Sequence, residues 1–127
     1  MQISVKIPVQ PEAVAMARDT VSRVVADRRA DPRRVEDLRL LTSEVVTNAL
    51  RHSGMTPGGS LTVAVDIESD RVRVGVTDDG PGFDPDALRG PSPDDVGGWG
   101  LLLVEQLADS WGVIGDGSTF VWFELKL

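Results

Sequence analysis

The stretch that decides the fold is EVVTNALRH, residues 44–52. Its apolar residues follow a helical repeat, so Val45 and Ala49 lie on one stripe of a predicted helix. Glu44 and Asn48 are four residues apart and therefore lie one turn above each other on another face. That face is turned by about 100° from the apolar stripe. The stretch thus predicts a helix that holds a carboxylate and an amide at the rim of the core.

This pair of side chains suits a magnesium–phosphate site. Mg²⁺ takes oxygen ligands and keeps several waters, so the Asn48 carbonyl together with nucleotide phosphates is a sufficient set of ligands. The Glu44 carboxylate could accept a proton from a water or hydroxyl that attacks the last phosphate. Glutamate and asparagine are also common on the polar rims of helices. The helix alone therefore leaves a purely structural interpretation open.

Two glycine-containing segments carry further candidate residues. In VTDDGPGF, residues 76–83, a strand delivers Asp78 to a loop where Gly80 and Gly82 let the backbone approach a flat ligand. A carboxylate there can accept a hydrogen bond from the exocyclic amine of adenine. GGWG, residues 97–100, leads into an apolar helix, whose free N–H groups and dipole suit phosphates. The alternatives are an ordinary turn and a plain glycine loop.

The hydrophobic pattern of the whole chain predicts an α+β fold. Strands are predicted at residues 3–9, 61–67, 72–77, 111–114 and 119–127, and helices at about 11–29, 33–53 and 99–110. Because each strand has one apolar face, we expect a two-layer sandwich with helices on one side only. The sheet would be a mostly antiparallel mixed sheet of about five strands, with three helices on one face. The pattern contains no repeat or boundary, so we expect residues 1–127 to form a single domain.

Composition excludes several classes of function. The formal net charge is −7, which disfavours direct binding of nucleic acid. The chain has no cysteine and one histidine, which excludes disulfides and thiolate sites and disfavours zinc. Apolar runs such as residues 101–104 are too short to cross a membrane, so we expect a cytoplasmic protein. Arginines concentrate between residues 18 and 39, where a solvated face is favoured over a docking site.

In this order, the three segments resemble the N, G1 and G2 boxes of the GHKL ATPase superfamily, also called the Bergerat-fold ATPases. This superfamily includes gyrase, heat-shock chaperone, histidine kinase and mismatch-repair ATPases. The resemblance covers about residues 41–124. Within the superfamily the chain is most similar to the anti-sigma factor serine/threonine kinases of bacteria. These are small stand-alone domains that end in a strand like the Trp-Phe-Glu-Leu of residues 122–125.

The resemblance implies a role for each matching residue. Glu44 would be the general base and Asn48 the magnesium ligand, while Asp78 would bind the adenine amino group with support from Thr119. Residues 84–97 would form a lid over ATP. The full set of implied nucleotide contacts is Asn48, Arg51, His52, Asp78, Gly80, Gly82, Gly98, Gly100, Leu101 and Thr119.

The implied function is transfer of phosphate from Mg-ATP to a serine or threonine of a STAS-type anti-anti-sigma partner. Sequestration of a sigma factor and a homodimer through the first strand or helix are also implied. The chain departs from the family pattern at Trp99, where many members carry arginine or another polar residue. This departure motivates the alternative of an ATP-binding switch that binds a partner without phosphate transfer. The catalytic half of a histidine kinase is disfavoured, because the dimerising hairpin with its phosphoacceptor histidine is missing.

Overall fold

The computed structural model describes residues 1–52, 58–78, 99–116 and 118–127. Within these ranges the chain forms five strands and three helices. The strands are β1 (Gln2–Pro8), β2 (Ser60–Glu68), β3 (Arg71–Asp78), β4 (Ser110–Asp116) and β5 (Ser118–Lys126), and the helices are α1 (Ala13–Val25), α2 (Pro32–His52) and α3 (Trp99–Leu107).

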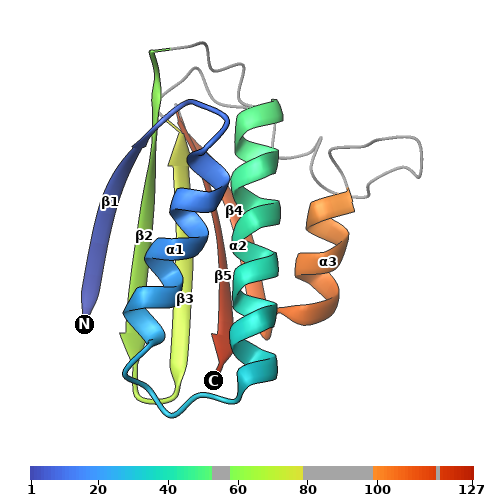
Figure 1. Ribbon diagram of the computed structural model, residues 1–127. Helices are drawn as coiled ribbons and strands as arrows, with labels where there is room; N and C mark the ends of the chain where they lie inside the picture. Colours follow the sequence, from blue (N-terminus) through green and yellow to red (C-terminus); the bar gives the residue numbers. More distant parts are fainter. Residues whose placement is uncertain (53–57, 79–98, 117) are drawn as a thin grey trace.

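The strands form one open sheet in the spatial order β1-β2-β3-β5-β4, with β3 in the centre (Figure 1). All four strand pairings are antiparallel, so the described sheet contains no parallel pair. A two-residue turn, Ser69-Asp70, joins β2 to β3. Ser69 takes a φ of 53° there and is the one non-glycine residue with positive φ in the described part of the chain.

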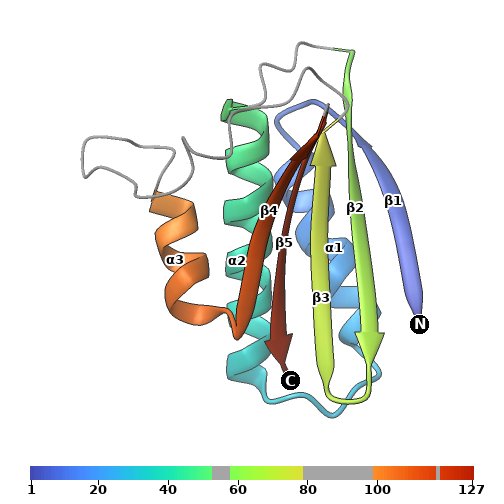
Figure 2. The ribbon, with the colours of Figure 1, turned by 180° about the vertical axis from the view of Figure 1, so that it is seen from behind.

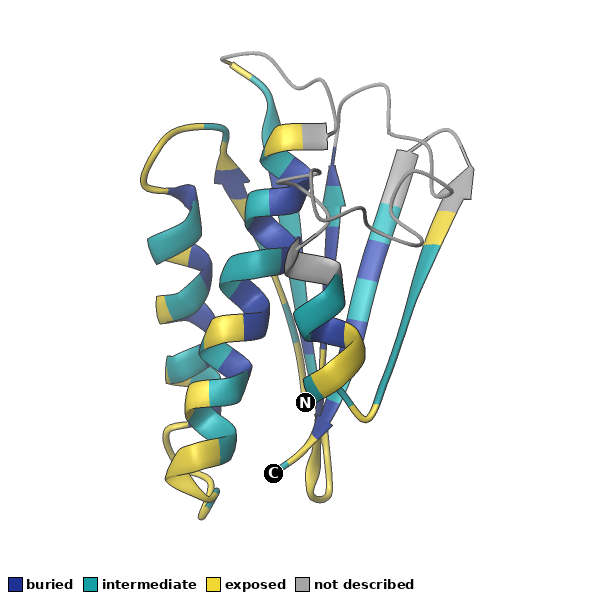
Figure 3. Ribbon diagram, turned by 90° about the vertical axis from the view of Figure 1, so that its right-hand side faces the viewer, coloured by how far each residue is buried: buried dark blue, intermediate teal, exposed yellow. Residues whose placement is uncertain are grey.

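The three helices lie on one face of the sheet, and the view from behind shows the other face bare (Figure 2). The predicted two-layer α+β sandwich is therefore confirmed. Buried residues gather where the two layers face each other (Figure 3). The apolar stripe of α2 is part of this core, with Leu41 and Val45 at 0% exposure. On the sheet, Val74 and Phe123 are also fully buried.

Two helices are shorter than the sequence pattern predicted. Beyond Val25 the backbone bonds change, because Ala26 donates to Arg23 and Arg28 donates to Val25, each three residues back. Such bonds close a helix in a tight turn, so α1 does not continue to residue 29. Helix α3 ends at Leu107 because Ser110 already pairs with Glu124 of β5. No helix in the described ranges combines the length and apolar character needed to span a membrane.

One arginine ties the start of α2 to the end of β5. Arg34 Nε donates to the backbone oxygen of Lys126 at 2.9 Å, and Arg34 Nη2 donates to Asp109 Oδ2 at 3.0 Å. The same Asp109 oxygen accepts the backbone N–H of Lys126 at 2.6 Å. Since Asp109 lies between α3 and β4, this cluster joins three parts of the fold at the end of the sheet where β3 begins.

Candidate functional site

Three elements that carry predicted site residues end on the same side of the molecule. The carboxyl-terminal end of α2, the end of β3 and the start of α3 all lie at the upper end in Figure 1. Helix α2 also packs directly against both α3 and β3. Glu44 and Asn48 are on the second half of α2, Asp78 is the last residue of β3, and Gly100 is in the first turn of α3.

Asp78 is the one ionisable residue in the buried set of the described chain, with 1% exposure. It follows Val72, Val74 and Val76 at every second position, so it lies on the face of β3 that the helices cover. Burying a carboxylate is costly unless polar groups surround it. A carboxylate at this position is therefore a candidate for recognition of a polar ligand rather than a packing residue.

Asn48 is also buried, with 4% exposure, and its Nδ2 has no hydrogen-bond partner among the described residues. The two buried threonines of the helices differ, because Thr20 and Thr42 each donate to the backbone oxygen four residues earlier. Leaving a buried donor unsatisfied costs about 1–3 kcal/mol. The free amide hydrogens of Asn48 are what a bound ligand or water would satisfy. Its carbonyl oxygen is also a ligand type that Mg²⁺ accepts, so the residue fits the predicted role.

The other predicted residues are placed less fully. Glu44 is half-buried one turn before Asn48, and Arg51 is exposed one turn after it. The structure gives only the backbone positions of His52, Gly100 and Leu101, at the end of α2 and in the first turn of α3.

Thr119 is placed by the strand register. The β3–β5 pairing ends at Thr77 and Phe120, and Asp78 and Thr119 are each one residue beyond that pair. Thr119 pairs with Gly115 of β4. Gly80, Gly82, Gly98 and the lid predicted at residues 84–97 lie outside the described residues.

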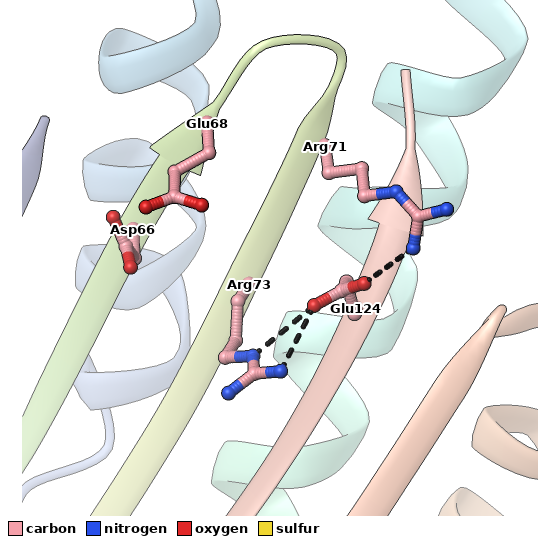
Figure 4. A pocket seen from close by; sticks show the side chains of 5 residues that line it. All are labelled: Asp66, Glu68, Arg71, Arg73 and Glu124. Atoms are coloured by element: carbon pink, nitrogen blue, oxygen red, sulfur yellow. Dashed lines mark hydrogen bonds and ion pairs between the residues drawn. The ribbon is translucent and has the colours of Figure 1, made fainter.

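A second polar feature, which the sequence analysis did not predict, lies on the bare face of the sheet. It is an open hollow of about 280 Å³ lined by Asp66, Glu68, Arg71, Arg73 and Glu124 (Figure 4). Arg71 Nη1 donates to Glu124 at 2.8 Å, and Arg73 donates twice, at 3.2 and 3.0 Å. The sequence pattern that could have indicated this hollow is the placement of charged residues at every second position, Asp66 and Glu68 on β2 and Arg71 and Arg73 on β3.

These ion pairs change the acidity of the groups involved. The hydrogen bond from Arg71 lowers the pKa of Glu124, and Arg73 adds to the effect. The same contact raises the pKa of Arg71. Because Arg71 is the first residue of β3 and Asp78 the last, the hollow lies at the opposite end of the sheet from the candidate site. We assign it to strand pairing and not to ligand chemistry.

Comparison with known proteins identifies the fold. Residues 7–125 match the family model of the histidine kinase-like ATPase domain. The serine-protein kinase RsbW of Oceanobacillus iheyensis is 32% identical over 118 residues, which cover 84% of this chain and 75% of that protein. RsbW of Listeria innocua is 31% identical over 119 residues, covering 85% and 76%.

Solved structures show the same architecture. A Mycobacterium tuberculosis chain with RsbU and RsbW domains matches with a TM-score of 0.75 and 24% identity. The match covers 100% of this chain but only 32% of that longer one. A histidine kinase domain from Erythrobacter litoralis matches with a TM-score of 0.58 and 25% identity, covering 96% of this chain and 67% of that one. The chain therefore belongs to the family of histidine kinase-like ATPase domains, and within it to the RsbW-type serine-protein kinases.

Proposed function

We propose that this protein uses Mg-ATP to phosphorylate a serine or threonine of a STAS-type anti-anti-sigma partner, and that it also sequesters a sigma factor. The observation that carries this proposal is the pair of buried polar side chains, Asn48 and Asp78, where α2 and β3 end on one side of the molecule. The relatives named serine-protein kinase RsbW support the reaction type. We extend the proposal to a cytoplasmic protein that forms a homodimer.

Each residue would act through its own chemistry. The Asp78 carboxylate would accept a hydrogen bond from the amino group of adenine, and the Asn48 carbonyl oxygen would hold Mg²⁺. The backbone N–H groups of Gly98, Gly100 and Leu101 would bind phosphate, as the start of a helix does. Bound Mg²⁺ would neutralise charge on the phosphates. The hydroxyl oxygen of the partner's serine or threonine would attack the terminal phosphorus of ATP, and ADP would leave. Glu44 would accept the proton of that hydroxyl group.

A nucleotide titration tests the binding half of this proposal. We expect ATP and ADP to bind only with magnesium and GTP to bind much more weakly. Guanine carries an oxygen at the ring position where adenine carries the amino group that would face Asp78. Asp78→Asn should abolish binding, since the amide places an N–H group where an acceptor is needed. Equal affinity for ATP and GTP, or unchanged binding by Asp78→Asn, would contradict the assignment.

Phosphate transfer tests the catalytic half. Glu44→Ala should keep nucleotide binding but lose transfer to a STAS-type partner, because only the proton acceptor is removed. Glu36→Ala is the matched control, since Glu36 is an acid near the other end of α2, far from the candidate site. If no candidate partner gains phosphate from the unaltered protein, the kinase assignment is wrong.

The second candidate function is a switch that binds ATP and a partner without transfer. Trp99 favours it, because its side chain brings no charge to a phosphate between the glycines where many family members have a polar residue. In that case Glu44→Gln would leave partner binding intact and the unaltered protein would show tight ATP binding with no turnover. Measurable turnover would exclude the switch.

A further inference from the structure

We propose that Gly75 on β3 and Phe120 on β5 are positioning residues for nucleotide recognition. The Phe120 ring packs on Gly75 and sets the register in which β5 meets the end of β3, where Asp78 lies. The inference rests on the proposed function, because it assumes that Asp78 contacts the base. It concerns residues that contact neither ATP nor the reacting atoms, so the expected role is to hold Asp78 in place.

The ring occupies the space that a side chain at position 75 would need. A Cβ atom added to Gly75 would lie 2.3 Å from both Cε2 and Cζ of Phe120, closer than real Cβ atoms approach. Gly75 is buried although it lies on the bare face of the sheet, because the ring covers it. Phe120 pairs with Thr77, so its ring reaches diagonally across the strands to position 75. In designed sheets, aromatic rings over edge-strand glycines help to fix register, and here a ring packs in the same way on a glycine of the central strand.

This contact lies next to the candidate site. Thr77 and Phe120 form the last β3–β5 pair, and Asp78 and Thr119 are the next residue on each strand. Beyond that pair, Asp78 is held within the sheet by its pairing with Leu61 of β2. A slip of one residue in the register moves every side chain of a strand to the other face of the sheet. The register of β5 against β3 therefore decides which residue of β5 lies beside Asp78.

The chain offers a matched control on the other side of β5. A Cβ atom added to Gly112 of β4 would lie 2.7 Å from Nε1 of Trp122, so this glycine also makes room for an aromatic ring of β5. Gly112 pairs with Trp122, and the guanidinium of Arg73 stacks on the same indole at 4.5 Å. Crowding at Gly112 acts on Trp122, which pairs with Gly112 of β4 and with Gly75 of β3, three residues before Asp78. Crowding at Gly75 acts on Phe120, whose pair with Thr77 lies directly beside Asp78.

The test compares Gly75→Ala, Gly112→Ala, Phe120→Ala and the double variant Gly75→Ala/Phe120→Ala at a temperature where circular dichroism shows all four folded. Calorimetric titration with Mg-ATP and Mg-GTP gives both affinities. We expect Gly75→Ala to weaken ATP binding roughly ten- to hundredfold, as loss of a hydrogen bond to a charged group does. GTP binding should change less, so the preference for ATP should narrow.

The controls separate positioning from general damage. Gly112→Ala should lower the melting temperature but change ATP affinity by less than about twofold. That change is well below the roughly tenfold or larger loss expected for Gly75→Ala. The double variant should bind ATP better than Gly75→Ala, because removal of the ring gives the methyl group added at position 75 room. The proposal is overturned if Gly75→Ala binds like the unaltered protein, if Gly112→Ala loses as much affinity, or if the double variant is no better than Gly75→Ala.

A measurement without nucleotide distinguishes this proposal from the proposed function. In the ¹⁵N–¹H spectrum of the free protein, Gly75→Ala should shift the amide resonances of Asp78 and Thr119. Gly112→Ala should leave the Asp78 resonance in place and shift only that of Thr119, because Thr119 pairs with Gly115 of β4. If Gly75→Ala shifts neither amide resonance, the proposal that Phe120 and Gly75 position Asp78 is overturned, whatever the affinities for ATP and GTP are. If the unaltered protein shows no preference for ATP over GTP, the base assignment of Asp78 fails instead, even where the resonances shift.

Discussion

Arg34 and Asp109 are joined by an ion pair of 3.0 Å although 75 positions of sequence separate them. The contact connects the first turn of α2 to the loop between α3 and β4, and Arg34 also donates to the backbone of Lys126. Since α2 carries Asn48 near its other end, this cluster anchors the helix far from the candidate site.

Replacing Arg34 should therefore lower stability without changing nucleotide binding. We expect Arg34→Met to reduce the free energy of unfolding by about 1–2 kcal/mol, because several hydrogen bonds of a partly buried group are lost together. Urea unfolding measures this loss. Arg33→Met is the matched control, since the Arg33 side chain is exposed, and should change stability by less than about 0.5 kcal/mol. Equal losses in the two variants would contradict this account.

Adjacent leucines of α2 should differ sharply in their contribution to stability. Leu41 is fully buried, whereas Leu40 is 41% exposed. Leu41→Ala should lower the free energy of unfolding by about 2–5 kcal/mol through lost burial and a cavity. Leu40→Ala should cost less than about 1 kcal/mol. Denaturant unfolding of both variants checks the difference, and similar costs would mean that α2 faces the sheet differently.

The turn between β2 and β3 should be improved by glycine. Ser69 holds a φ of 53°, a conformation that costs a residue with a Cβ atom. We expect Ser69→Gly to raise the free energy of unfolding by about 0.5–1 kcal/mol. Ser69→Ala should give no gain, because alanine keeps the Cβ atom. Thermal unfolding of the two variants compares them, and a gain with alanine would point to another cause.

Glu124 should make the stability depend on pH. Its pKa is lowered in the folded protein, mainly by the hydrogen bond from Arg71. The group therefore binds protons more weakly when folded, and its stabilising contribution is present above the unfolded pKa of about 4.3. That contribution is lost as the pH falls through the lower, folded pKa.

The comparison is between the unaltered protein and Glu124→Gln, with the free energy of unfolding measured near neutral pH and at about pH 3. The unaltered protein should be the more stable at neutral pH, and the gap should shrink in acid. In a chain that also carries Arg71→Met and Arg73→Met, the same glutamine substitution should give a gap with much less dependence on pH. A gap that grows in acid would reverse the sign of our argument.

Strands and helices were predictable because periodicity reports burial directly. The alternation in residues 61–67 and 72–77 gave β2 and β3 to within one residue, and the apolar stripe gave the inner face of α2. The end of α1 was not predictable, since bonds made three residues back after Val25 leave no mark in the hydrophobic pattern. The charged hollow was missed for a related reason. Glu124 faces Arg73 only through the β3–β5 register, which depends on a contact between distant parts of the chain.

The candidate site was predictable as a set of residues but not as an arrangement. Motif order singled out Asn48 and Asp78, and the structure shows both to be buried at the same end of the molecule. The roles of all the predicted site residues, Asn48 and Asp78 included, stay predictions. The aromatic ring over Gly75 could not be read from the sequence, because it requires knowing that β5 lies beside β3.

The central pairing of β3 with β5 has a consequence for how the chain folds. The β2–β3 and β4–β5 hairpins are local in sequence, and hairpins form within microseconds. Joining them requires closure of the chain between Asp78 and Ser118, and such non-local steps slow folding. The entropy of closure grows only with the logarithm of loop length. Insertions between Asp78 and Ser118 should therefore delay folding only slightly, so the fold tolerates changes of chain length between the two hairpins.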